Sequence, residues 1–364
     1  MDRAEIYGRT LKHFLSPVAE LLYNDDSVSE VLVNGPDTVY CERRGRLEPV
    51  NVRFKDAEAL EAAARNLAEY VRRRLDDDHH SMDARLPEPE KFRVHVIIPP
   101  CARNGVCLSI RKFKRSTATL EWLVEMNSAS KEVVDFLRTA VRIHCNILVA
   151  GGTGTGKTSL LNAMSTAILD DERIIVIEDT AELQLHQPHT IYLEARPPKP
   201  DGKGAVTIRD LFVDSLRMRP DRIVVGEVRR GEALDLVQSM LSGHDGSLAT
   251  IHASTPQSAL VRLETLCLMS DVALPVYVAR QQAGSAVHLV VQIARVEGAR
   301  RISEISKVDG LDDKDRYVVT SLFKYKPGAG WEYSGAPWRF AEEAFEKGLV
   351  SKETEAIFQR MRGG

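Results

Sequence analysis

Hydrophobic and polar residues follow two different patterns along the chain, and the change comes near residue 120. Residues 5–23 carry apolar side chains at helical spacing, whereas residues 29–54 alternate between apolar and polar and turn at Asn34-Gly35-Pro36. A charged helix is expected at about 56–75, then a polar loop, "RLDDDHHSMDARLPEPEKF", and two strands, "RVHVIIPP" and "GVCLSIRKF". This part predicts a small α+β domain over residues 1–112.

A short polar stretch, residues 113–120, follows, and we interpret it as an interdomain hinge. Beyond it, the strands "NILVAG", "RIIVIED", "RIVVGE" and "GSLATIHA" are each followed by a helical pattern and are apolar nearly throughout. Such strands are typical of a parallel sheet covered by helices on both faces. The pattern predicts an α/β domain over residues 121–325, which three more strands complete. For residues 326–364 we expect a tail made of a surface hairpin and a polar helix.

Composition and charge narrow the class of protein. The 364 residues suffice for two domains, and 49 Lys and Arg against 52 Asp and Glu give a net charge of -3, which lends nucleic-acid binding no support. The 5 cysteines are scattered without a Cys-x-x-Cys pair, so buried free thiols are expected rather than zinc or disulfides. There is no signal peptide and no apolar run of about 18 residues. A cytoplasmic protein is therefore expected, which partners would hold if it works at a membrane.

One motif identifies a ligand directly. "NILVAGGTGTGKTSLLNAM" is a strand, a glycine-rich turn and a helix, and it matches G-x-x-x-x-G-K-[ST] completely. In such a loop, backbone N–H groups and the positive end of the helix bind phosphate oxygens, the lysine reaches the β- and γ-phosphates, and the threonine ligates Mg²⁺. ATP and Mg²⁺ are therefore the expected cofactors. The nucleotide-binding residues are Gly151, Gly152, Thr153, Gly154, Thr155, Gly156, Lys157, Thr158 and Ser159.

Two acids end strands of the predicted parallel sheet. "RIIVIED" ends in Glu178-Asp179 and "RIVVGE" ends in Glu227, and the carboxyl ends of parallel strands share one edge with the phosphate loop. Phosphate-loop ATPases usually end the second strand in an aspartate, but Gly226 stands in that place here. Glu178 and Glu227 still suffice to hold metal-bound water and to orient or deprotonate an attacking water. The alternative is that Glu178 caps a helix and Glu227 merely ends a strand.

Several cationic side chains are candidates for the phosphate site. Arginines near a γ-phosphate stabilise transition-state charge, often across a subunit boundary. A histidine after an apolar strand is more often a core residue or a helix cap than a functional one. The candidates are Arg85, Arg93 and Arg111 in the first domain, Arg196, Arg209, Arg217 and Arg219 ahead of the second acidic strand, and His244 and His252 after it.

Together these motifs resemble the secretion and pilus ATPase family, the traffic ATPases of type II and type IV secretion. "GGTGTGKT" is its phosphate loop, "IIVIEDTAEL" resembles its aspartate box, "LRMRPDRIVVGEVR" its second acidic strand, where Gly-Glu is the normal ending, and "GHDGSLATIHA" its histidine box. The resemblance extends to about residue 325. It implies an α/β protein with a RecA-like phosphate-loop C-terminal domain, preceded by a smaller α+β, PAS-like domain, that assembles into a homohexameric ring.

The resemblance also implies roles for single residues. Glu227 would be the catalytic acid and Glu178 a partner of water or Mg²⁺, and both would reach the metal through water. Catalytic roles are further implied for Arg196, Arg209, Arg219 and His252, nucleotide contacts for Arg93 and Arg111, and supporting roles for Arg85, Arg217 and His244. ATP would lie at the domain junction, and hydrolysis would rotate the domains and move a platform protein of the inner membrane.

Within that family, one subgroup is most similar. "VLVNGPDTVYCERRGRL", "RVHVIIPP", "SIRKF", "LEARPPKPDGKGAVTIRDL" and "SALVRLETL" most resemble the CpaF-type ATPase of Tad (Flp) pilus assembly. This similarity implies a motor that assembles, or also retracts, a Tad pilus. The tail after about residue 325, with Trp331 and Trp338, matches no part of the family pattern.

The phosphate-loop motif is also compatible with other functions. A traffic ATPase of a type IV secretion or conjugation channel shares the family motifs. A DNA translocase would need a basic channel, against which the near-neutral charge speaks. A small-molecule kinase would leave the histidine box and the first domain unexplained, and a non-hydrolysing scaffold would not need Lys157, Glu178 and Glu227 together.

Overall fold

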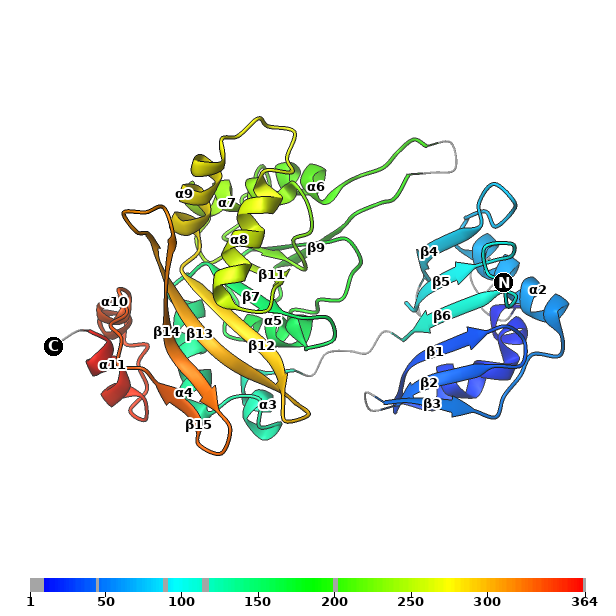
Figure 1. Ribbon diagram of the computed structural model, residues 1–364, viewed down its shortest axis with the longest axis horizontal. Coiled ribbons are helices and arrows are strands. Elements are labelled where there is room, and N and C mark those ends of the chain that lie inside the picture. Colours follow the sequence, from blue (N-terminus) through cyan, green and yellow to red (C-terminus); the bar gives the residue numbers. More distant parts are fainter. Residues whose placement is uncertain (1–9, 44–45, 88–90, 113–117, 199–201, 363–364) are drawn as a thin grey trace. The chain divides into compact units, whose positions relative to one another are not determined.

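The structure is a computed structural model that describes residues 10–43, 46–87, 91–112, 118–198 and 202–362. The chain divides into two compact units (Figure 1). One comprises Met1–Arg115 with Pro198–Gly204, and the other Ser116–Pro197 with Ala205–Gly364. Most of the predicted hinge, residues 113–117, lies outside the described residues.

The N-terminal unit is built on a 6-stranded antiparallel sheet with the order β3-β2-β1-β6-β5-β4. The helix α2 (Ala57–Tyr70) begins where the side chain of Asp56 accepts a hydrogen bond from the backbone N–H of Ala59. Its apolar stripe, including Leu60 and Leu67, packs into the core that the sheet forms. The strands are β1 (Val28–Asn34), β2 (Val39–Arg43), β3 (Arg46–Val50), β4 (Ser81–Arg85), β5 (Arg93–Ile97) and β6 (Cys107–Arg111).

Two sequence predictions for this unit are wrong. The polar loop predicted over residues 74–92 contains β4, whose residues pair in antiparallel register with those of β5. Only Met82 of that edge strand is buried, so no apolar alternation marks it in the sequence. The first helix is also interrupted, by a 3-10 turn at Ser16–Val18 and a π turn at Glu20–Asn24, and Pro17 removes one backbone donor there.

The second unit is a 9-stranded mixed sheet with helices on both faces (Figure 1). Its strand order is β15-β14-β13-β12-β7-β11-β10-β8-β9, parallel from β12 to β9 and antiparallel from β12 to β15. The strands are β7 (Ile147–Gly151), β8 (Ile174–Glu178), β9 (Thr190–Glu194), β10 (Arg222–Val225), β11 (Leu248–His252), β12 (Leu289–Val296), β13 (Ala299–Leu311), β14 (Tyr317–Lys326) and β15 (Gly330–Tyr333). The helices are α3 (Leu120–Glu125), α4 (Lys131–Arg142), α5 (Lys157–Ser165), α6 (Ile208–Ser215), α7 (Glu232–Leu241), α8 (Pro256–Cys267), α9 (Val276–Ala286), α10 (Ala341–Glu346) and α11 (Glu355–Met361).

Side chains from the two faces of this sheet enter two separate cores. One core contains Phe136 of α4 and Leu160 of α5, and the other contains Phe212 of α6 and Leu260 of α8. Every residue of β7 and β8 is buried, as expected for central parallel strands. The predicted α/β architecture is confirmed in this unit. The helix predicted directly after β8 is wrong, because the chain first forms β9 alongside it.

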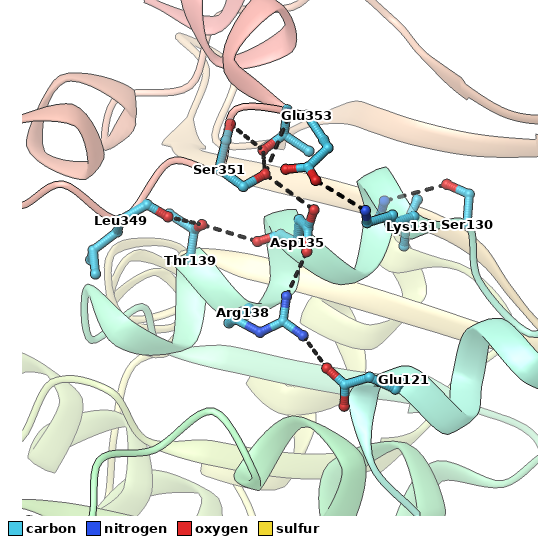
Figure 2. A network of polar contacts seen from close by, with 11 residues as sticks. Glu121, Ser130, Lys131, Asp135, Arg138, Thr139, Leu349, Ser351 and Glu353 are labelled. Carbon is cyan, nitrogen blue, oxygen red and sulfur yellow. Dashed lines mark hydrogen bonds and ion pairs between the residues drawn. The ribbon is translucent and has the colours of Figure 1, made fainter.

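The tail predicted over residues 326–364 packs onto the second unit. β15 extends the sheet by pairing with β14, and the ring of Trp338 lies 4.8 Å from that of Phe136 on α4. Figure 2 shows the polar contacts around the same helix: Ser351 Oγ donates to Asp135 Oδ2 at 3.2 Å, and Thr139 Oγ1 donates to the carbonyl oxygen of Leu349 at 3.2 Å. The tail therefore covers α4 with both aromatic and polar contacts.

Candidate nucleotide-binding and catalytic site

The phosphate loop runs from the end of β7 to the start of α5. Gly154 and Gly156 have φ values of +69° and +99°, a backbone conformation that favours glycine. At Gly151 a Cβ would lie 2.6 Å from the carbonyl oxygen of Ile293, so the loop passes too close to β12 for any side chain there. These glycines shape a tight turn that opens onto the N-terminus of α5, the arrangement that binds phosphate.

Lys157, the first residue of α5, is only 8% exposed. Its Nζ donates to the carbonyl oxygen of Gly152 at 3.0 Å and lies 3.4 Å from Nδ1 of His252. Burial lowers the pKa of Lys157, and the carboxylate of Glu227 opposes that shift. The next residue, Thr158, donates its hydroxyl to Oε2 of Glu182 at 3.2 Å. The loop therefore places a cation and a hydroxyl beside acidic side chains.

Glu227 and His252 meet at the same edge of the sheet as the phosphate loop. Glu227 follows β10, His252 ends the neighbouring β11, and His252 Nε2 lies 2.7 Å from Glu227 Oε1. Burial lowers the pKa of His252, Lys157 lowers it further, and Glu227 acts in the opposite direction. Because the ammonium of Lys157 can only donate, Nδ1 of the neutral ring faces it as an acceptor, and the ring proton is on Nε2. Nε2 is close to Glu227 Oε1, but the two atoms are not aligned as a hydrogen bond.

Glu178 ends β8 and is 4% exposed. Its Oε1 accepts hydrogen bonds from the backbone N–H groups of Glu182 and Leu183, both at 2.9 Å. Burial raises the pKa of Glu178 to about 7, although the two backbone hydrogen bonds lower it. The structure therefore shows Glu178 bracing the turn after its own strand. The alternative interpretation, a helix cap, is wrong, because β9 and not a helix follows β8. The predicted role of Glu178 toward water or Mg²⁺ stays a prediction.

Gly226 separates β10 from Glu227. A Cβ at Gly226 would lie 2.8 Å from Cγ of Glu178 and 3.0 Å from its Oε1. The hydroxyl of Thr250 donates to the carbonyl oxygen of Gly226 at 2.6 Å, and the N–H of Val228 donates to the carbonyl oxygen of Thr250 at 2.9 Å. The backbone that carries Glu227 is thus fixed on both sides, and an aspartate in place of Gly226 would collide with Glu178.

The other predicted cations are distributed over several places. Arg196 follows β9 at the same edge as Glu178 and exchanges two backbone hydrogen bonds of 2.8 Å with Val206. Arg209 forms ion pairs of 3.1 Å with Asp235 and 2.7 Å with Asp271. The structure therefore gives Arg209 acidic partners within its own chain.

Arg217, Arg219 and His244 lie at the opposite edge of the sheet from the phosphate loop. The two arginines precede the first residue of β10, and His244 precedes the first residue of β11. A strand of four residues already spans about 13 Å. Within one chain these three residues are not part of the site, and a role for them at a phosphate remains a prediction for a neighbouring subunit.

The arginines of the N-terminal unit form a row. Arg85, Arg93 and Arg111 occupy directly opposed positions on β4, β5 and β6. Arg93 Nε lies 3.7 Å from Oδ1 of Asp83. The sheet register thus brings three cationic side chains together, and their role toward the nucleotide stays a prediction.

Two residues of the site were not predicted from the sequence. Arg229 contacts Glu227, and Glu182 accepts the hydrogen bond from Thr158. Each lies within four residues of a predicted acid, in the loop that follows an acidic strand. Because ligands bind at the carboxyl ends of parallel strands, the sequence indicated these loops, but it did not specify these two side chains.

The oxygen donors at this edge fit Mg²⁺. Within the described ranges, no three acidic, histidine or cysteine side chains converge into a metal site of their own. Mg²⁺ needs none, because it keeps several waters and is bound through one or two protein groups plus phosphate oxygens. The hydroxyl of Thr158 and the carboxylates of Glu178 and Glu227 are the groups that would hold it.

Comparison with known proteins identifies the family. The sequence profile of the family described as "Type II/IV secretion system protein" matches residues 12–315. The chain belongs to this family. The match contains the phosphate loop, both acidic strands and His252. The match confirms the resemblance to the secretion ATPase family that the motifs indicate.

Three known proteins show how similar the chain is to other proteins in sequence and in structure. A Mycobacterium tuberculosis protein whose name refers to conjugal transfer is 37% identical over 294 residues, or 79% of this chain and 83% of that protein. The type IV secretion system protein VirB11 of Bartonella quintana is 32% identical over 329 residues, or 80% and 91% of the two chains. The crystal structure of the pilus retraction motor PilT with bound ADP matches with a TM-score of 0.53 at 16% identity, over 96% of this chain and 89% of that one.

The structural likeness confirms the predicted fold class for this secretion-family chain. It consists of a RecA-like phosphate-loop domain preceded by a smaller α+β domain. In the part of the chain that the structure describes, every helix is too short or too polar to serve as a membrane-spanning segment.

Proposed function

We propose that this protein hydrolyses ATP and works as a homohexameric motor that powers assembly of a Tad (Flp) type IV pilus through a membrane platform protein. One observation carries the ATPase proposal: Lys157, His252 and Glu227 form a continuous line of contacts at the phosphate loop, with separations of 3.4 and 2.7 Å. Membership of the secretion family supports it. The ring would work at the cytoplasmic face of the inner membrane, where its partners hold it.

Each residue of the site has a distinct task in this reaction. Lys157 and the N–H groups of the loop bind the β- and γ-phosphates, and bound Mg²⁺ would supply further charge neutralisation there. Glu227 orients the attacking water and accepts its proton, because it is the carboxylate joined to the loop through His252. His252 holds Glu227 in place. Glu178 fixes the neighbouring turn, and its carboxylate would hold a water of bound Mg²⁺.

Substitution of Glu227 tests the ATPase proposal. E227Q keeps the shape and polarity of the side chain but cannot accept a proton, so hydrolysis should fall by a factor of about 10²–10⁴ while ATP still binds. K157A serves as the contrasting variant, because it should lose nucleotide binding itself. Phosphate release and the binding of a fluorescent ATP analogue are measured for both variants and the wild type. Wild-type hydrolysis by E227Q would show that Glu227 is not the catalytic acid.

The machine that the motor serves needs its own test. The segments that resemble CpaF-type ATPases favour a Tad pilus, whereas the relatives named for conjugal transfer and type IV secretion favour a traffic ATPase of a secretion channel. ATPase activity is therefore compared with and without the purified cytoplasmic domain of a Tad platform protein. Stimulation supports the pilus motor. A prepilin gene and two small platform genes beside this one would support it further, and channel genes would favour the secretion system.

A further inference from the structure

Arg229 lies between the ends of the two acidic strands. Its Nε and Nη2 are each 2.5 Å from Oε2 of Glu227, and its Nη1 is 3.3 Å from Oδ2 of Asp179. Asp179 follows β8 and Glu227 follows β10, and these strands are neighbours in the sheet. A single guanidinium therefore connects the two acidic strand ends.

The backbone beneath Arg229 is held firmly. The N–H groups of Arg229 and Arg230 donate to Oε1 of Glu232 at 2.7 and 2.9 Å, and Glu232, the first residue of α7, is 7% exposed. At Gly231 a Cβ would lie 2.7 Å from Cα of Ser270, so the loop is packed directly against the chain after α8. The guanidinium thus projects from a fixed support.

The two oxygens of Glu227 have different neighbours. Oε1 faces His252, whereas both N–H groups from Arg229 reach Oε2. Rotation of the carboxylate about its last bond would break the two contacts with Arg229 and move Oε1 away from His252. A planar guanidinium that binds through two N–H groups opposes such a rotation more strongly than a single donor can.

We propose that Arg229 is a positioning residue that fixes the carboxylate of Glu227 toward His252 and the phosphate loop. Asp179 holds the guanidinium from the other side. This role rests on the proposed hydrolysis of ATP with Glu227 as the catalytic acid. Arg229 acts through Glu227, so it changes the rate of the chemical step and not the binding of the nucleotide.

The test compares three variants of the full-length protein. R229Q removes the charged guanidinium, and R229K keeps one charged donor. R230Q changes the neighbouring arginine, which is exposed. For R229Q, kcat should fall about tenfold with KM for ATP within about twofold of the wild type, because a misplaced catalytic group slows the chemical step. R229K should recover part of the loss, and R230Q should match the wild type. Thermal unfolding midpoints of all three should stay near that of the wild type.

Several outcomes would overturn the positioning role. A wild-type kcat in R229Q would show that Glu227 does not need Arg229 to position its carboxylate. A rise in KM that accounts for the whole loss in kcat/KM would make Arg229 a nucleotide-binding residue instead. D179N tests the outer contact and should reduce kcat less than R229Q does. E227Q is assayed alongside: if it retains activity, the catalytic assignment itself fails, whereas an inactive E227Q with a fully active R229Q removes only the role of Arg229.

Discussion

Gly226 and Glu178 stand in direct contact across two neighbouring strands. The position where a Cβ of residue 226 would lie is 2.8 Å from Cγ of Glu178. The glycine that replaces the usual aspartate before Glu227 is therefore a steric requirement. Space at the carboxyl end of β10 is occupied by the acid from β8, and the two acidic groups of the site come from different strands.

A methyl group at residue 226 should disturb both acids. G226A forces Glu178 or the backbone of β10 to shift, which should lower the free energy of unfolding by about 1–3 kcal/mol and reduce ATP turnover. Urea unfolding and phosphate release measure the two effects. G152A is the matched control for stability, because a Cβ there would meet nothing closer than Thr155 Cγ2 at 3.7 Å. Equal unfolding free energies for G226A and G152A would contradict the steric explanation.

The sequence predicted the part of the site that depends on strand ends. Glu178, Glu227 and His252 lie at one edge because parallel strands end together, and the motif located the loop that joins them. The same rule excludes Arg217 and Arg219 from that edge within one chain, since they come before a strand and not after it. β4 and β9 were not predicted, because each is an edge strand with at most one buried residue and so lacks an apolar pattern. Each forms by hydrogen bonding to a single neighbouring strand.

Glu178 should make stability depend on pH. Its pKa is about 7 in the folded chain against a usual 4.5, so the folded state binds more protons between these values and loses stability as pH rises through them. E178Q keeps the oxygen that accepts the two backbone hydrogen bonds but cannot ionise. The difference in unfolding free energy between E178Q and the wild type should therefore grow in favour of E178Q from pH 5 to pH 8, by up to about 3 kcal/mol. Urea titrations in a series of buffers measure it, and a difference independent of pH would show that Glu178 stays ionised.

His252 should support catalysis only as the neutral imidazole. Its pKa is lowered below the usual 6.5, so the ring that bridges Lys157 and Glu227 remains neutral at pH 7 and above. H252A removes the bridge and should lower kcat by about tenfold or more with a smaller change in KM. Because His252 is neutral there, it should not limit the activity of the wild type between pH 6.5 and 8. Protonation of His252 at lower pH should reduce that activity. The pH profiles of kcat for the two proteins test this, and identical acid limbs would assign that limb to another group.

The tail should be required for the stability of the second unit. Trp338 is 2% exposed, and its ring lies 4.8 Å from Phe136 of α4 and 6.1 Å from Phe358 of α11. W338A would leave a cavity where three aromatic side chains meet, so it should lower the free energy of unfolding by about 3–5 kcal/mol. E353A removes only exposed polar contacts of the tail, among them the ion pair with Lys131 that Figure 2 shows, and it should leave the unfolding transition nearly unchanged. Thermal and urea unfolding of the two variants measure the contrast. The ring packs against α4, the helix that precedes β7, so loss of Trp338 should also weaken ATP binding at the phosphate loop. A destabilised W338A that still bound ATP with wild-type affinity would show that the tail stabilises α4 without affecting that loop.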